Sequence, residues 1–139
     1  MISHLHGILS FSGDRFAVLD VGGVGYRVNT TLDTLRRAAS EKSADGRVRF
    51  FTHLAVRENA MDLYGFLSRA ELEFFELLIT VSGIGPKTAL GILNTASVET
   101  MLSGISSGDG AHFAKITGLR GKNAQKIMLE LKDKIGGFG

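Results

Sequence analysis

The sequence predicts a small β barrel followed by a helical domain. In residues 1–67, short segments rich in Val, Ile, Phe and Tyr alternate with turn residues, a pattern typical of strands. From Ser68 onward, apolar residues instead recur at the spacing of one helix face. A glycine-rich turn between two such helical segments occurs twice, around Gly83 and around Gly118. These three observations place the change of architecture at Ser68.

Five segments of the first part are expected to be strands. One short helix, Thr31–Ala39, falls between the third and the fourth of them, with Thr30 or Thr31 as its N-cap. A five-stranded barrel with a helix in this position has the layout of the OB-fold. The expected strands are Ile2–Ser10, Arg15–Val21, Tyr26–Thr30, Arg47–Arg57 and Met61–Leu67.

The first helix of the second part is expected to begin at Ser68–Glu71. This segment has the pattern of a capping box, in which a hydroxyl and a carboxylate satisfy amide groups at the start of a helix. Pro86 suits the first turn of the next helix, which runs to about Thr95. The positions expected to be buried in the first of these helices are Leu72, Phe75, Leu78 and Ile79.

Three more helices are expected before the end of the helical domain at residue 135. Ser97 and Asp109 are candidate N-caps for two short ones. The last runs from about Lys122 to Ile135, and residues 136–139 resemble the start of a linker. The sequence therefore divides into residues 1–67, 68–135 and 136–139. The expected buried stripe of the last helix is Ala124, Ile127, Met128, Leu131 and Ile135.

Val81–Ala89 and Ile116–Ala124 share one pattern, an apolar helical run, a turn containing glycine and a second helix, with Lys87 and Lys122 at matching places. This is the signature of the helix-hairpin-helix motif. A helix that begins after a glycine turn directs free amide groups at a phosphate, and a lysine there adds charge without reading bases. The candidate DNA-binding residues are Ser82, Gly83, Ile84, Gly85, Lys87, Thr88, Thr117, Gly118, Leu119, Arg120, Gly121, Lys122, Asn123 and Lys126.

Composition limits the other possibilities. The formal net charge of +2 is uninformative, but Lys115–Lys134 is locally basic, with only Glu130 and Asp133 as acids. The chain has no cysteine, which excludes disulfides and thiolate metal sites. It starts without a signal-peptide pattern and has no apolar stretch long enough to cross a membrane. We therefore expect a cytoplasmic protein that has no membrane association.

Motifs for nucleotide hydrolysis and catalysis are not found. A P-loop needs a Gly-Lys pair, but Pro86 separates Gly85 from Lys87. A dinucleotide-binding fingerprint needs a third glycine, and Val28 stands at that position. Three histidines lie on expected strands without a carboxylate at matching spacing, so we expect no metal site. The sequence predicts a non-catalytic protein without cofactors.

Taken together, these segments resemble the RuvA family of Holliday-junction-binding subunits. Thr52–Asn59 and Leu63–Phe66 are similar to the family's last two barrel strands, and Val21–Tyr26 to its early glycine turn. Val81–Lys87 and Leu129–Lys134 are similar to its two helix-hairpin-helix blocks. The resemblance covers nearly the whole chain in order.

The resemblance implies a barrel that assembles a homotetramer, or an octamer of two tetramers on DNA, and hairpins that bind the four duplex arms of a Holliday junction. It further implies a role in DNA recombination, in the repair of DNA damage and in the SOS response, with RuvB as the motor and RuvC as a further partner. It also implies an acidic pin in the turn after the fourth strand, at the tetramer centre. That turn holds Glu58 and Asn59, where the family usually has two acids.

The sequence departs from the family pattern at three places, and each departure leads to a separate prediction. With Asn59 in the pin we expect a weaker repulsion of phosphates and less discrimination against plain duplex. Arg120 stands where the first hairpin has Gly85. Because arginine avoids positive φ, we expect the second turn to shift by one residue; as an alternative, its guanidinium reaches a phosphate and strengthens binding. The family continues into a third domain that contacts RuvB, whereas this sequence stops at Gly139. Junction binding without stimulation of RuvB is the resulting expectation.

Two other classes of function stay open at this point. A general helix-hairpin-helix repair protein, such as a glycosylase or a nuclease accessory subunit, is one alternative. A glycosylase or lyase would need a catalytic lysine or aspartate soon after a hairpin, and only Glu99 and Asp109 are acidic between the two turns. An assembly module would use the glycine turns for packing alone. A steep dependence of affinity on salt would distinguish phosphate binding from such packing.

Overall fold

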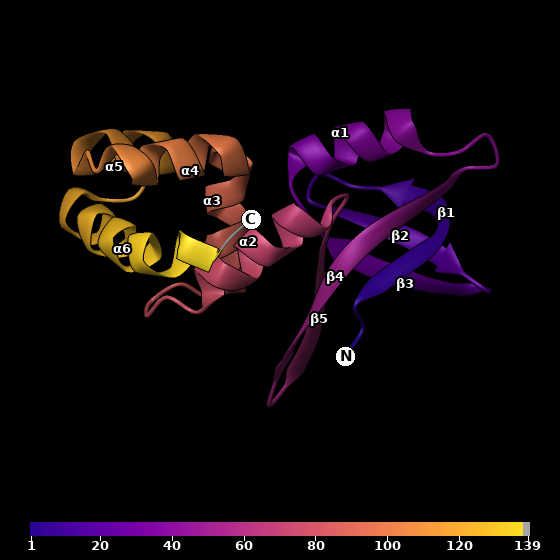
Figure 1. Ribbon diagram of the computed structural model, residues 1–139. Coiled ribbons are helices and arrows are strands. Elements are labelled where there is room, and N and C mark those ends of the chain that lie inside the picture. The colour runs from indigo at the N-terminus through magenta and orange to yellow at the C-terminus, as the bar shows by residue number, and fades with distance from the viewer. Residues whose placement is uncertain (138–139) are drawn as a thin grey trace. The chain divides into compact units, whose positions relative to one another are not determined.

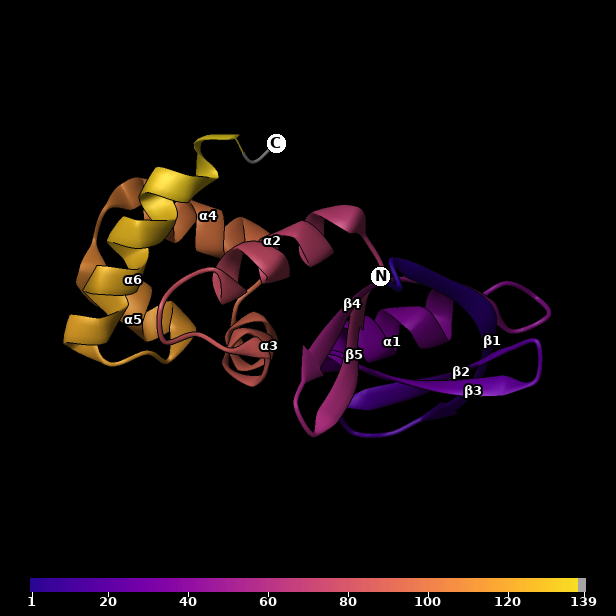
Figure 2. The same cartoon turned by 90° about the horizontal axis from the view of Figure 1, so that it is seen from below.

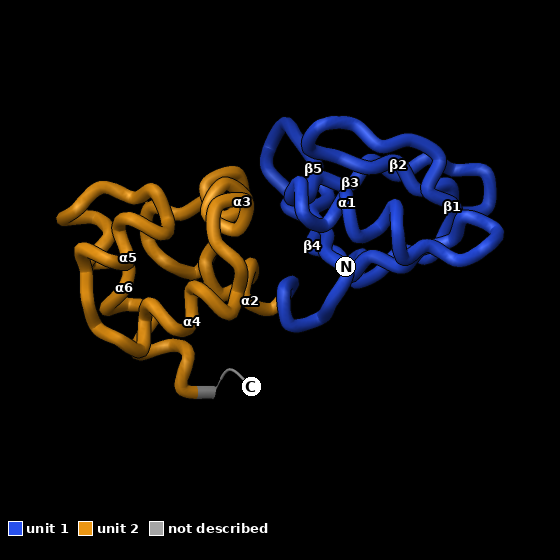
Figure 3. The backbone as a smooth tube through the Cα atoms, turned by 90° about the horizontal axis from the view of Figure 1, so that it is seen from above, with its two compact units in different colours: residues 1–72 blue, residues 73–139 orange. Residues whose placement is uncertain are grey.

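Five strands close into a barrel in the first part of the chain (Figure 1). The computed structural model describes residues 1–137, and the chain divides into two units, residues 1–72 and residues 73–139 (Figure 3). Neighbouring strands follow the order β1-β2-β3-β5-β4 and are antiparallel, except that β3 and β5 are parallel. The predicted OB-fold barrel is confirmed. Its strands are β1 (His4–Ser12), β2 (Phe16–Val21), β3 (Val24–Asn29), β4 (Arg47–Arg57) and β5 (Ala60–Phe66).

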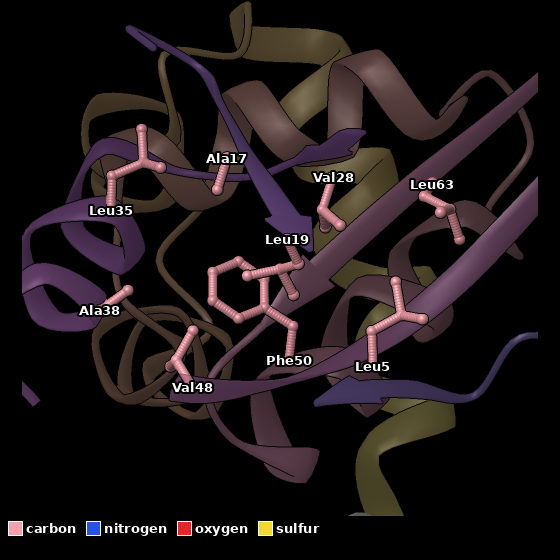
Figure 4. Close-up of a cluster of buried hydrophobic side chains, with 9 residues drawn as sticks. All are labelled: Leu5, Ala17, Leu19, Val28, Leu35, Ala38, Val48, Phe50 and Leu63. Carbon is pink, nitrogen blue, oxygen red and sulfur yellow. The ribbon is translucent and has the colours of Figure 1, made fainter. Parts of the chain in front are cut away.

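The barrel interior is filled by apolar side chains that alternate with outward-facing residues. On β2, Ala17 and Leu19 are fully buried, and on β4 Phe50 is fully buried, because a strand directs every second side chain to the same face. Figure 4 shows Phe50 among side chains that come from several strands and from the helix beside them. The core of this unit consists of Leu5, Ala17, Leu19, Val28, Leu35, Ala38, Val48, Phe50 and Leu63.

Helix α1 (Leu32–Glu41) lies between β3 and β4 in the sequence, as predicted. Its N-cap is Thr31, whose side-chain oxygen accepts a hydrogen bond of 3.1 Å from the amide of Thr34. Thr30, the other candidate, instead donates its hydroxyl hydrogen to the carbonyl of Gly65 at 2.6 Å. The two adjacent threonines therefore have separate tasks, since one begins the helix and the other joins the chain to β5.

Helix α2 (Arg69–Ile79) begins at Ser68, whose hydroxyl oxygen accepts a hydrogen bond from the amide of Glu71 at 3.2 Å. The Glu71 carboxylate accepts a hydrogen bond from that hydroxyl, and its two oxygens both accept from Nη2 of Arg37, each at 2.9 Å. The predicted capping role of Ser68 is thus confirmed, while the carboxylate ties α1 to the start of α2. The predicted buried face is wrong at one position, because Ile79 is only half-buried and Phe74 is fully buried.

Four more α-helices follow, and α6 lies beside α5 and α4 (Figure 2). The side chains of Ser97 and Asp109 accept hydrogen bonds at the starts of α4 and α5, so both predicted caps are confirmed. Ile135 is half-buried rather than buried, because the last α-helix ends at Lys134 and a 3-10 turn follows. The elements are α3 (Pro86–Thr95), α4 (Val98–Ser107), α5 (Gly110–Thr117), α6 (Gly121–Lys134) and the 3-10 helix η1 (Ile135–Gly137).

The predicted linker, residues 136–139, overlaps the end of the described chain. Its first two residues belong to η1, and residues 138–139 lie outside the described residues. None of the helices in residues 1–137 has the length and apolar character needed to cross a bilayer.

Gly7 provides a test of the barrel. A Cβ at this buried position of β1 would overlap the backbone carbonyl of Asp20 on β2, so we expect Gly7→Ala to lower the free energy of unfolding by about 1–3 kcal/mol. Gly91 on α3 is the control, because a Cβ there meets no atom within 4 Å and alanine favours a helix. Urea unfolding followed by circular dichroism should show Gly91→Ala unchanged or stabilised. Equal effects of the two substitutions would contradict this packing.

Candidate nucleic-acid interface

The first hairpin turn joins α2 to α3. Gly83 adopts a φ of +88°, a left-handed conformation that a side chain disfavours. The amide of Ile84 donates a hydrogen bond of 3.1 Å to the carbonyl of Val81, which closes the turn. Gly85 is extended, with φ −92° and ψ 178°, and is the N-cap of α3.

The second hairpin turn, between α5 and α6, has the same backbone pattern. Gly118 adopts a φ of +74° and ends α5. The Thr117 hydroxyl donates to the carbonyl of Phe113 at 2.7 Å and accepts from the amide of Leu119 at 3.3 Å. Arg120 is extended, with φ −78° and ψ 147°, and is the N-cap of α6.

The expected shift of the second turn is wrong. Gly83 and Gly118 are the positions that need positive φ, whereas Gly85 and Arg120 are both extended, so arginine fits without strain. The first intrahelical hydrogen bond is also equivalent in the two helices. The amide of Ala89 donates to the carbonyl of Gly85, and the amide of Ala124 donates to the carbonyl of Arg120. The two turns are therefore equivalent in backbone geometry despite the exchange of glycine for arginine.

The helices that follow the two turns begin without a side-chain cap. Neither α3 nor α6 has a side-chain hydrogen bond at its N-cap. The other α-helices of residues 1–137 do have one, from Thr31, Ser68, Ser97 and Asp109. The amides of a first helical turn have no partner inside the helix and carry the positive end of its dipole. Both turns thus leave donors available to an anion.

Only a few amides in the first turns of α3 and α6 are left without a partner inside the helix. On α3 they belong to Lys87 and Thr88, because Pro86 at the first helical position has no N–H. On α6 they belong to Gly121, Lys122 and Asn123. The second turn therefore offers one donor more than the first at its first helical position.

Both turns are open to solvent at their glycines. A Cβ placed on Gly83, Gly85, Gly118 or Gly121 would meet no atom within 4 Å, so a ligand can reach the backbone there. Most predicted DNA-binding side chains are exposed, but Ile84 and Thr117 are each 5% exposed and Leu119 is half-buried. Any contact between a phosphate and Ile84 or Thr117 would come from the backbone. The exposed predicted residues are Ser82, Gly83, Gly85, Lys87, Thr88, Gly118, Arg120, Gly121, Lys122, Asn123 and Lys126.

The basic side chains around the second turn all face solvent. The two acids of this stretch, Glu130 and Asp133, lie late in α6, away from its start at Gly121. A cluster of cations without interspersed acids at the helix start adds attraction for an anion. The exposed basic residues are Lys115, Arg120, Lys122, Lys126, Lys132 and Lys134.

The predicted pin residues form the tip of the hairpin between β4 and β5. Arg57 pairs with Ala60 across the ladder, which leaves Glu58 and Asn59 as an exposed two-residue turn. Arg57 forms a salt bridge of 3.4 Å with Asp62 just behind the turn. Figure 1 shows this hairpin extending beyond the rest of the barrel. The Glu58 carboxylate thus lies at the exposed tip of a projecting hairpin.

The histidines considered as metal ligands do not form a site in the part of the chain that the structure describes. His4 and His6 are exposed on β1, and residues 1–137 contain no group of three or more ligating side chains that could hold a metal ion.

Comparison with known proteins identifies both units. Residues 1–65 match the model of the RuvA N terminal domain, and residues 75–133 match that of a SAM-like helix-hairpin-helix tandem. A relative from Dehalococcoides mccartyi, named Holliday junction branch migration complex subunit RuvA, is 46% identical over 97% of this chain and 68% of its own length. The chain belongs to the RuvA family. The helix-hairpin-helix prediction is thereby confirmed as well.

Other RuvA proteins are similar over the same span. The one from Symbiobacterium thermophilum is 43% identical over 98% of this chain and 65% of its own length. The one from Geotalea daltonii is 41% identical over the whole of this chain and 68% of its own length. The chain therefore spans about two thirds of the length of these RuvA relatives.

Substitution of the two glycines of the first turn, Gly83 and Gly85, should change the stability of the protein by different amounts. We expect Gly83→Ala to lower the free energy of unfolding by about 1–2 kcal/mol, because a Cβ is strained at positive φ even in open space. For Gly85→Ala we expect a change below about 0.5 kcal/mol, since its φ is extended and the lost N-cap preference is offset by a less flexible unfolded chain. Urea unfolding of both variants measures this, and similar losses would contradict the assigned turn geometry.

Proposed function

We propose that this chain binds four-way Holliday junction DNA through the phosphate backbones of the duplex arms. The observation that carries the proposal is the pair of uncapped helix starts behind equivalent turns at Gly83 and Gly118. In support, relatives that are 43% and 46% identical over 98% and 97% of this chain are named as subunits of the Holliday junction branch migration complex.

In this proposal each hairpin turn binds one stretch of phosphate backbone. The first-turn amides of both helices donate hydrogen bonds to phosphate oxygens. They are those of Lys87 and Thr88 on α3 and of Gly121, Lys122 and Asn123 on α6. The lysine side chains add charge-assisted contacts that carry no sequence information. Binding would therefore depend on the shape of the DNA and on salt, and not on base sequence.

The choice of a junction over plain duplex is assigned to the β4–β5 turn. A carboxylate at the tip of a projecting hairpin repels phosphates that approach it and favours DNA whose strands separate there. Glu58 supplies that charge, whereas Asn59 supplies none at the neighbouring position. We infer that the pin of this chain is weaker than one built from two acids.

The barrel, residues 1–67, is proposed to assemble a homotetramer that places four such turns at its centre, while residues 68–135 bind the arms. An octamer of two tetramers would enclose the junction from both sides. We further propose a non-catalytic role, in which the chain supplies a DNA platform for the RuvB motor and for RuvC in recombination and repair.

A gel-shift comparison of a four-way junction with a matched duplex, combined with the mass in solution, tests the proposal. We expect tighter binding to the junction and a tetrameric or octameric mass. Equal affinity for both DNAs in a monomeric protein would overturn it, and base release from damaged duplex would favour a glycosylase.

The hairpin lysines should control affinity and its salt dependence together. We expect Lys87→Ala and Lys122→Ala each to weaken junction binding by roughly tenfold at low salt and to reduce the slope of log affinity against log salt by about 1 per lost contact. Lys42, an exposed lysine at the end of α1, is the matched control and should have no effect. Fluorescence anisotropy over a salt series measures both quantities. Losses that are as large for Lys42→Ala would indicate general charge attraction instead.

The pin assignment predicts opposite effects at two neighbouring residues. Glu58→Gln should reduce the preference for junction over duplex, because it removes the one charge at the tip. Asn59→Asp should increase that preference by adding a second charge. Competition binding with both DNAs measures the ratio, and a ratio that neither substitution changes would show that the turn does not face the crossover.

A further inference from the structure

An irregularity in β1 turns a phenylalanine to the outside of the barrel. Leu9 pairs with Leu19, which is fully buried, so the regular alternation would point Phe11 inward as well. A β-bulge between Leu9 and Phe11 shifts the register, and Phe11 instead pairs with the outward-facing Val18. The Phe11 side chain is consequently 57% exposed.

A second ring and a guanidinium group lie beside Phe11. The rings of Phe11 and Phe16 have centroids 5.8 Å apart and planes inclined by 31°. The Arg27 guanidinium carbon lies 3.8 Å from the centre of the Phe16 ring, in a cation–π contact. Phe11, Val18 and Arg27 are successive cross-strand partners on β1, β2 and β3. We refer to Phe11, Phe16 and Arg27 as the aromatic platform.

The platform is held in place by the backbone around it. The Ser10 hydroxyl, within the bulge, donates to the carbonyl of Val18 at 3.1 Å. The amide of Gly13 donates to the carbonyl of Phe16 at 2.8 Å, and a Cβ on Gly13 would come within 2.6 Å of the Phe16 ring. The loop therefore packs directly against that ring. A ligand that stacks on the platform meets a preformed surface and pays little ordering entropy.

We propose that the aromatic platform binds an unpaired base of single-stranded DNA. A base has a π face that stacks on an exposed phenylalanine ring or on a guanidinium plane, and its phosphates are attracted by nearby arginines. Arg27 supplies that positive charge over the Phe16 ring, and Arg15 precedes Phe16 in the chain, against the single acid Asp14 in the connecting turn. Since stacking reads no base edge, the site accepts any sequence. This site lies on the barrel and does not rest on the proposed junction binding by the hairpins.

The test uses the full chain with Lys87→Ala and Lys122→Ala, so that contacts at the hairpins are removed. In this background we expect a labelled oligothymidylate to bind, and Phe11→Ala to weaken that binding by about tenfold or more. Leu32→Ala, which removes an exposed apolar side chain from α1, is the matched control and should leave the affinity unchanged. Junction binding by a chain that carries only Phe11→Ala should stay at the level of the unsubstituted protein.

A second variant reports on stacking directly. Because the chain contains no tryptophan, Phe11→Trp introduces a single indole at the platform. We expect Phe11→Trp to retain oligothymidylate affinity and its emission to be quenched as a base stacks on it. Unchanged affinity in Phe11→Ala, an absence of quenching in Phe11→Trp, or loss of all oligothymidylate binding in the lysine background would each overturn the proposal. None of these results bears on whether the unsubstituted chain prefers junction over duplex, so the two proposals fail separately.

Discussion

The geometry of both hairpin turns depends on the left-handed backbone conformation of two glycines, Gly83 and Gly118. Each lets the chain reverse direction within a few residues and leaves the next helix to begin with unpaired amides. A side chain that capped α3 or α6 would satisfy those amides internally and compete with a phosphate for them. The protein stabilises its other helix starts with Thr, Ser and Asp side chains. The absence of such a side chain at α3 and α6 leaves their first-turn amides available to an anion.

The two turns show which residues of a hairpin turn can be exchanged without a change of backbone geometry. The positive-φ position is glycine in both, while the N-cap is Gly85 in one and Arg120 in the other. Because the N-cap backbone is extended, it does not require glycine. The second turn therefore has a cation, Arg120, at its N-cap without a change of backbone conformation. The first helical position is Pro86 in one turn and Gly121 in the other, which exchanges a rigid helix start for an additional donor.

Most of the fold follows from local chemistry, whereas the details of the surface do not. The capping residues Ser68, Ser97 and Asp109 were predictable because a side chain and an amide three positions away are sufficient to define them. The same reasoning wrongly predicted strain at Arg120. A turn that contains two glycines does not show from sequence alone which of the two positions adopts a positive φ. The position of Phe11 was also beyond prediction, since a β-bulge depends on pairing with a distant strand. The missing side-chain caps at Gly85 and Arg120 follow from residue type, because glycine has no side chain and the arginine guanidinium has no acceptor for a helix amide.

The most direct measurement is the backbone amide NMR spectrum of the ¹⁵N-labelled chain during titration with a short duplex that represents one junction arm. We expect the largest shifts at the first-turn amides of α3 and α6, which belong to Lys87, Thr88, Gly121, Lys122 and Asn123, and smaller shifts at the capped starts of α4 and α5. Similar shifts at capped and uncapped helix starts would contradict the proposed binding through free amides.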